Sequence, residues 1–144
     1  MIRKAEIKDL SKLAEIAGIF SKISKFVSVD MEIFCKSWAG FIENELGVIF
    51  VSEKDNEITG CIGGLKFNDP NSGVLMASEL FWIVHPNHRG IGLGLLKAFE
   101  GWAKDNDCKK VVMVHISDCM PEVVKKIYER KGYEKMETHY IKGV

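Results

Sequence analysis

An apolar run near the middle of the chain leads through a proline into three alternating glycines. Residues 81–84 are apolar, residue 86 is the proline, and the segment that follows, here called the glycine loop (residues 89–95), reads Arg89-Gly90-Ile91-Gly92-Leu93-Gly94-Leu95. Glycines let a backbone approach a ligand closely. A helix beginning near Ile91 would add unpaired N–H groups and a partial positive charge. The segment therefore predicts a site for a phosphate or pyrophosphate.

Two well-known phosphate motifs do not fit this spacing. A dinucleotide fingerprint has Gly-x-Gly-x-x-Gly directly after a strand, whereas here Leu95 takes the third glycine's place and four residues separate the strand from Gly90. A P-loop ends in Gly-Lys-Ser/Thr, whereas Gly94 is followed by Leu95-Leu96. Close packing of a helix on a strand, with no ligand, is the alternative explanation for the glycines.

The first half of the chain predicts the elements on which this loop would be mounted. Residues 2–7 alternate loosely and predict a short strand, and Asp9 and Asp30 are suited to cap two amphipathic helices. Residues 48–51 and 58–67 predict a hairpin. Glycines at 60, 63 and 64 in its second strand indicate a bulge or a close backbone approach.

The second half predicts strands and helices in alternation. A strand over 74–84 enters the glycine loop, and a helix follows with Leu95, Leu96, Phe99 and Trp102 on one face. Residues 110–116 are nearly all apolar and predict a central buried strand. Pro121 suits the first turn of a helix ending at Gly132, and residues 133–141 predict one or two final strands.

The resulting order, β-α-α-β-β-β-α-β-α-β, predicts an α/β fold with a mixed sheet covered by helices on both faces. The helix between the strands over 74–84 and 110–116 predicts a parallel crossover, and the hairpins predict antiparallel pairing. A chain of 144 residues fits one domain, 1–144.

Composition limits the partners and the compartment. The chain has 20 basic and 20 acidic residues and a formal net charge of zero, so nothing in it favours nucleic acid or a membrane surface. No apolar run approaches the ~20 residues of a membrane span, the first residues lack the apolar core of a signal peptide, and the four cysteines form no CxxC pair. We expect a cytoplasmic protein with reduced cysteines and no metal, and the sequence leaves monomer and homodimer open.

Nearly the whole chain resembles the GNAT superfamily of acyl-CoA-dependent N-acyltransferases. The glycine loop matches Arg/Gln-x-x-Gly-x-Gly/Ala, three residues after a strand-ending proline, and Tyr128-x-x-x-Gly132-Tyr133 follows on the last helix. The start, Ile2-Arg3-Lys4-Ala5 with Asp9-Leu10, is also similar to that family's. The resemblance implies a mostly antiparallel mixed sheet whose central parallel strands splay apart.

The resemblance further implies acetyl-CoA as the acyl donor. Backbone N–H groups of Gly90, Ile91, Gly92, Leu93, Gly94 and Leu95 would hold its pyrophosphate, and a Cβ at Gly92 or Gly94 would push the phosphates away. For the Arg89 side chain, a pyrophosphate contact and a plain surface position are both open. Trp82, Ile83 and Val84 would pair with the pantetheine arm, and the Val84 amide would polarise the acyl carbonyl.

For catalysis, the resemblance implies Tyr128 as general acid toward the CoA sulfur, against the alternative of a simple core tyrosine. Glu79 would act as the base through water if burial raises its pKa, and otherwise is a solvated or ion-paired strand residue. His115 is the other candidate base, with a core histidine as its alternative. One departure is Pro121, which stands where family members often carry a CoA-contacting asparagine.

The interpretations of the donor site and of the catalytic residues together predict an N-acetyltransferase that acts on a primary amine. The acceptor, a small molecule or a protein, is not named by the sequence. Its site would involve residues 20–38 and 137–140, which include several aromatic side chains. The competing hypothesis is a CoA-binding regulatory or interaction module with little catalysis.

Overall fold

The computed structural model describes all of residues 1–144, and the chain divides into two compact units, Met1–Val114 and His115–Val144. The first contains β1 (Ile2–Lys4), α1 (Leu10–Phe20), α2 (Met31–Glu43), β2 (Gly47–Lys54), β3 (Glu57–Asn68), β4 (Leu75–Val84), α3 (Gly92–Asp105) and β5 (Lys110–Val112). The second contains α4 (Pro121–Arg130). The prediction of one domain over 1–144 stays a prediction.

The first unit is built on one mixed sheet with the strand order β1-β2-β3-β4-β5. The first four strands pair antiparallel, and β4 and β5 pair in parallel, as the crossover through α3 predicts. The pairing of β4 with β5 covers only Met76 to Ser78, so the rest of β4 has no strand partner on that side. The predicted separation of the two parallel strands is therefore present.

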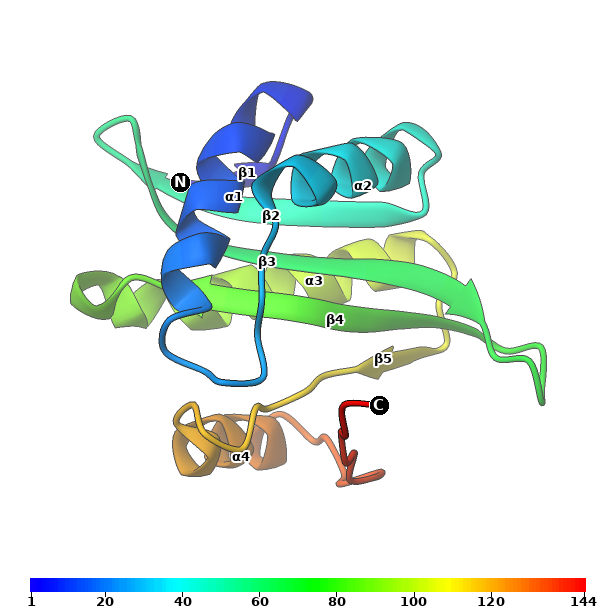
Figure 1. Cartoon of the computed structure of the whole chain (residues 1–144). Helices are drawn as coiled ribbons and strands as arrows, with labels where there is room; N and C mark the ends of the chain where they lie inside the picture. Colours follow the sequence, from blue (N-terminus) through cyan, green and yellow to red (C-terminus); the bar gives the residue numbers. More distant parts are fainter. The chain divides into compact units, whose positions relative to one another are not determined.

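Helices cover both faces of this sheet (Figure 1). On one face, α3 packs Leu95, Phe99 and Trp102 against Val48, Phe50 and Ile62 of the strands. On the other, α1 and α2 pack Leu13 and Trp38 against Ile49, Val51 and Cys61. Consecutive strand residues thus enter opposite cores, and the strongly apolar strands follow from their burial on both faces.

The two predicted helix caps have different outcomes. Asp30 caps α2, because its Oδ1 accepts a hydrogen bond from the Ile33 N–H at 2.9 Å. Asp9 has helical backbone angles and makes no such bond at the start of α1. Its carboxylate instead accepts from the Glu6 N–H at 2.7 Å and from Arg3 at 2.8 Å. This competition for the carboxylate makes the predicted Asp9 cap wrong.

The predicted strand over 110–116 is shorter and lies elsewhere in the sheet. β5 ends at Val112 and is the edge strand, with intermediate rather than complete burial, so it is not a central strand. Its apolar residues indicated burial but could not indicate how many strands would flank it.

The second unit begins with the expected helix but lacks the expected strands. Pro121 occupies the first turn of α4, and Gly132, with a φ of 86°, follows its end. No strand forms over residues 133–141, which corrects that prediction. Val123 is half exposed, although its spacing indicated a core position.

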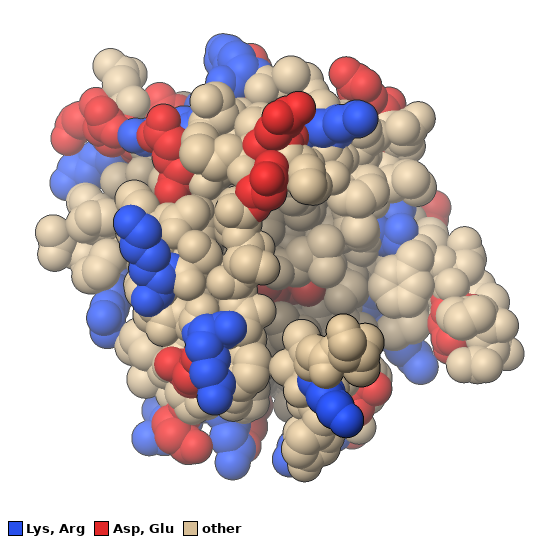
Figure 2. All heavy atoms as spheres, in the orientation of Figure 1, with Lys and Arg blue, Asp and Glu red and all other residues tan.

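Charged side chains of both signs are interspersed over the face shown in Figure 2, without a large area of one sign. This agrees with the equal numbers of acidic and basic residues. None of the helices combines the length and hydropathy that a membrane-spanning segment requires.

Candidate active site

A β-bulge in the middle of β4 organises the candidate site. Gly63 pairs with Phe81 and Gly64 with Glu79, so Leu80 is an extra residue without a counterpart on β3. The bulge changes the side-chain alternation after Glu79. Phe81 turns to the α2 face, where its ring lies 5.2 Å from that of Trp38, and Leu80 is 52% exposed.

The two glycines opposite the bulge are required by close contacts. A Cβ on Gly64 would collide with the Ser78 carbonyl oxygen and lie 2.5 Å from the Phe99 ring. A Cβ on Gly63 would collide with the Phe81 ring. The prediction of a bulge or a close backbone approach at these glycines is confirmed.

Glu79 is buried at this bulge, with 3% of its surface exposed. Glu79 is paired with Gly64, and a Cβ on Gly64 would point toward Phe99 of α3. Paired residues direct their side chains to the same face, so the Glu79 side chain lies on the α3 face of the sheet. Its Oε2 accepts a hydrogen bond from the Val114 N–H at 3.1 Å, just beyond the end of β5. The carboxyl group thus lies where the two parallel strands cease to pair.

Burial raises the pKa of Glu79 to about 7, and the Val114 N–H bond opposes this shift by favouring the charged form. No lysine or arginine forms an ion pair with Glu79. The carboxyl group can therefore both bind and release a proton near neutral pH. The alternatives of a solvated or ion-paired Glu79 are excluded.

The last residues of β4 expose one backbone edge. The His85 N–H donates to the Thr59 carbonyl on β3 at 2.9 Å. Successive residues of a strand direct their N–H groups to opposite sides, so the Val84 N–H points away from β3. That is the side on which β5 has ended, and Ile83 and Val84 are only partly buried.

The glycine loop forms a short 3-10 segment and the start of α3. A 3-10 helix covers Pro86–Ile91, and α3 begins at Gly92, one residue from the predicted start. The Gly92 N–H already donates to the Arg89 carbonyl, and the Arg89 side chain is exposed. The free N–H groups of the first turn of α3 therefore belong to residues after Gly92.

The glycines of this loop have different surroundings. A Cβ on Gly92 would lie 3.2 Å from the Trp82 ring, and one on Gly94 would lie 2.6 Å from the Ile2 Cδ1. Both would meet protein atoms, which does not fit the expectation that they would displace phosphates. Close packing of α3 on the sheet explains Gly92, whereas the one neighbour at Gly94 is the end of the flexible, partly exposed Ile2 side chain. Only Gly90 faces open space.

The other residues of the loop contribute mainly backbone. Leu95 is completely buried in the α3 core, Ile91 is half-buried, and Leu93 is half exposed. Any contact that Leu95 makes with a ligand is restricted to its N–H group.

Tyr128 and His115 belong to the second unit. Tyr128 is half-buried on α4, with its ring 5.5 Å from that of Tyr133. His115 is exposed and lies outside any strand, which corrects its predicted position inside a strand of residues 110–116.

Comparison with known proteins identifies the family. The model of the acetyltransferase (GNAT) family matches residues 15–133, most of the chain. The chain belongs to the GNAT acetyltransferase family. It is therefore an acyltransferase by family, and its mixed sheet is the fold that the resemblance implied.

Solved structures of GNAT proteins share the fold at low sequence identity. A predicted acetyltransferase from Clostridium acetobutylicum, determined with acetyl-CoA, is 20% identical with a TM-score of 0.81, over 99% of this chain and 95% of that one. Glucosamine-6-phosphate N-acetyltransferase from Arabidopsis thaliana is 20% identical with a TM-score of 0.77, over 99% and 97%.

A third similar structure is the ribosomal-protein-alanine N-acetyltransferase from Brucella melitensis biovar Abortus 2308. It is 16% identical with a TM-score of 0.75, over 100% of this chain and 99% of that one. At these identities the likeness concerns the GNAT fold alone. A search among curated proteins found no significant match.

Other candidate reactive groups have simpler roles in this GNAT chain. All four cysteines are free, and burial raises the pKa of Cys61 to about 12, which leaves it an unreactive thiol. The rings of His85 and His88 lie 5.8 Å apart, and no group of three or more His, Cys, Asp or Glu residues could hold a metal ion.

Two parts of the site could not be found by inspecting the sequence. The Val114 amide that binds Glu79 is a backbone group, so no residue type indicates it. Phe81 appeared only as part of an apolar strand, yet it joins Phe34 and Trp38 in an aromatic cluster on the α2 face.

Proposed function

We propose that this protein transfers the acetyl group of acetyl-CoA to a primary amine, by direct attack of the amine on the thioester. The observation that carries the proposal is Glu79, a buried carboxyl group with a pKa of about 7 at the point where β4 and β5 stop pairing. An amine must lose a proton to become a nucleophile, and a group that titrates near neutral pH is suited to accept it.

The proposed donor site is the edge of β4 and the glycine loop. Trp82, Ile83 and Val84 would add the pantetheine arm to the strand edge that β5 leaves open. The first turn of α3, with Gly90 open to solvent before it, would hold the pyrophosphate through the N–H groups of residues 93–95. Arg89, exposed beside this turn, would add a positive charge.

The chemistry proposed for the chain's own groups is a balanced acyl transfer. Glu79 takes a proton from the acceptor ammonium, directly or through water, and the free amine attacks the acetyl carbonyl carbon. The outward-pointing Val84 N–H donates to the carbonyl oxygen as negative charge develops on it. The C–S bond breaks, and the Tyr128 hydroxyl gives its proton to the departing thiolate. The new amide nitrogen loses its remaining extra proton to the Tyr128 phenolate, directly or through water, which restores the neutral tyrosine.

The role of Tyr128 rests on the family resemblance and its position on α4, and it separates this proposal from a CoA-binding module with little catalysis. If Tyr128 is the general acid, Tyr128→Phe lowers turnover by about 10²-fold while the affinity for acetyl-CoA is unchanged. A module without catalysis would release no thiol above background with either protein.

The test is a thiol-release assay with acetyl-CoA and a broad panel of primary amines, including amino sugars, polyamines and peptides with free N-termini. We expect at least one amine to give release that depends on Glu79 and Tyr128. Background release with every amine, together with acetyl-CoA binding by calorimetry, would support the module instead. Stabilisation by NAD or ATP but not by CoA would contradict the donor site itself.

We further propose a cytoplasmic location, since four free cysteines are typical of a reducing compartment. The interspersed surface charge in Figure 2 supports a small acceptor or a protein rather than nucleic acid.

A further inference from the structure

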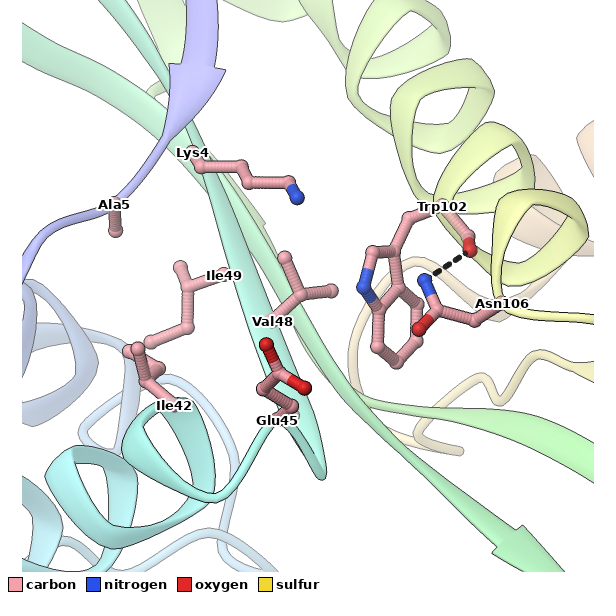
Figure 3. A pocket seen from close by; sticks show the side chains of 9 residues that line it. Lys4, Ala5, Ile42, Glu45, Val48, Ile49, Trp102 and Asn106 are labelled. Atoms are coloured by element: carbon pink, nitrogen blue, oxygen red, sulfur yellow. Dashed lines mark hydrogen bonds between the residues drawn. The ribbon is translucent and has the colours of Figure 1, made fainter.

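A cavity of about 260 Å³ lies in the first unit, at the opposite end of α3 from the glycine loop (Figure 3). It is bordered by Trp102 and Asn106, at and just beyond the end of α3, whereas the glycine loop leads into the first turn of α3 at Gly92. Ten residues of helix separate Gly92 from Trp102, which is about 15 Å. The cavity is therefore distinct from the proposed acetyl-CoA site.

The cavity surrounds the edge of β2 where β1 has ended. The last β1 pair is Lys4 with Phe50, and the Ala5 N–H then donates to the Ile49 carbonyl at 2.8 Å. Gly47, two residues before Ile49, directs its backbone groups to the same side of β2. No β1 residue pairs with Gly47, so this stretch of strand edge borders the cavity.

Two opposite charges point into the cavity from different elements. Figure 3 shows the Lys4 ammonium entering from the end of β1 and the Glu45 carboxylate from the loop after α2. Neither forms an ion pair, with the other or with any further residue, whereas the adjacent Arg3 is bound to both Asp9 and Glu53 at 2.8 Å. Both charges are available to a ligand.

The backbone at Glu45 is unfavourable for a glutamate. Its φ of 56° lies in the left-handed region, which glycine adopts more readily at the end of a helix. The neighbouring bonds fix this geometry: the Glu45 N–H donates to the Ile42 carbonyl and the Leu46 N–H to the Phe41 carbonyl. A carboxylate is thus held at the cavity at a position after the end of α2 where glycine would be the more stable residue.

The remaining wall consists mainly of apolar side chains together with Asn106, and their contacts hold it in position. Trp102 is 7% exposed and stacks on Phe99 with a centroid distance of 5.7 Å. Asn106 is held by its own donation to the Trp102 carbonyl at 2.9 Å and by the Lys66 ammonium at 2.8 Å. Val48 lies beside the indole in Figure 3. The cavity offers a rigid apolar surface between its two charges.

We propose that this cavity binds a small zwitterion of the α-amino acid class, with its carboxylate on Lys4, its ammonium on Glu45 and an apolar side chain against Trp102 and Val48. Lys4 and Glu45 are exposed, so either charge stays hydrated when it is unpaired. A ligand with only one charge would be repelled by the side chain of like sign, whereas a ligand with both charges pairs with both side chains. The volume of about 260 Å³ is just below the ~300–1,000 Å³ of drug-sized pockets, which suits an amino acid.

The direct test is an ¹⁵N NMR titration of the three tryptophan indole N–H signals, assigned with Trp→Phe variants. The probes are L-leucine, 4-methylpentanoate, which lacks the ammonium, and 3-methylbutylamine, which lacks the carboxylate. We expect leucine to shift the Trp102 signal in a saturable manner and to leave Trp38 unchanged, with each analogue binding about tenfold or more weakly. Equal binding of the analogues, or no Trp102 shift up to about 50 mM leucine, overturns the proposal.

Variants at the two charged walls provide the second readout. Lys4→Met and Glu45→Gln should each weaken leucine binding about tenfold, whereas the matched surface variants Lys8→Met and Glu43→Gln should bind like the parent. Glu45→Gly should also weaken binding while raising the melting temperature, because it relieves the left-handed backbone. Unchanged leucine binding in folded Lys4→Met and Glu45→Gln proteins contradicts the proposal, and acetyl-CoA binding should be unaffected in all five.

Discussion

The two halves of β4 have different roles: one builds the sheet, and the other carries groups that are proposed to act in acyl transfer. Residues 75–78 are paired with β3 on one side, and with β5 from Met76 on the other, and Met76 and Ala77 are buried. From Glu79 onward the strand is bulged and paired on one side only, and the residues after Glu79 are partly or largely exposed. The first half builds the sheet. The second half provides an unpaired backbone edge and a buried carboxyl group, which are the features that the proposed acyl transfer uses.

The largest effect is expected at Gly64, opposite the junction of the two halves. Gly64→Ala introduces a Cβ against the Ser78 carbonyl and the Phe99 ring, so it should lower the free energy of unfolding by about 3 kcal/mol. Chemical denaturation measures this loss. Gly101→Ala, in an open position of α3, is the matched control and should stabilise the protein by about 0.5–1 kcal/mol. Equal changes in the free energy of unfolding for the two substitutions would show that close contacts do not require glycine opposite the bulge.

Glu79→Gln should change how stability depends on pH. The folded pKa of about 7 lies above the ordinary value of 4.5, so the native state binds more protons than the unfolded state between these values. The parent protein therefore loses stability as pH rises through this window, and the variant does not. Between pH 5 and pH 8 the parent should lose about 2–3 kcal/mol relative to the variant, measured by urea unfolding.

A parallel pH dependence of the two proteins would show that Glu79 is charged throughout this range. Glu53→Gln is not a suitable control, because its carboxylate is paired with Arg3. Glu57→Gln at the exposed start of β3 is suitable, and its curve should follow that of the parent.

The glycine loop should show smaller effects that differ between its positions. Gly92→Ala places a Cβ 3.2 Å from the Trp82 ring and should cost about 1 kcal/mol of stability. Gly90→Ala meets nothing within 4 Å and should leave stability within about 0.5 kcal/mol, while weakening acetyl-CoA binding through the added methyl group. Thermal unfolding and calorimetric titration with acetyl-CoA separate these effects. Unchanged affinity in Gly90→Ala would argue against pyrophosphate binding at this position.

The sequence predicted the parts of the fold that depend on local pattern. Residue spacing predicted the buried faces of α1, α2 and α3 and the hairpin of β2 and β3. The Asp30 cap depends on one contact between residues three positions apart. The parallel pairing of β4 and β5 follows from the helix that connects them. Even the bulge was indicated, since paired glycines are unusual inside a strand.

What the sequence did not predict depends on contacts between distant segments. Asp9 has the residue type of a cap, but Arg3 and the Glu6 N–H bind its carboxylate. Residues 133–141 have strand-like composition but no strand partner. The burial of Glu79 and its bond to the Val114 N–H require the bulge, the end of β5 and the α3 core together. No single stretch of residues contains that information.

The protonation of Glu79 is the most direct test of the account, because the proposed acetyl transfer depends on a carboxyl group that accepts a proton near neutral pH. A ¹³C NMR titration of the glutamate side-chain carboxyl signals, with the Glu79 signal assigned by its loss in Glu79→Gln, gives this value in the intact protein. We predict a midpoint of about 7. A midpoint near the ordinary 4.5 of a solvated glutamate would contradict the assignment of Glu79 as the base.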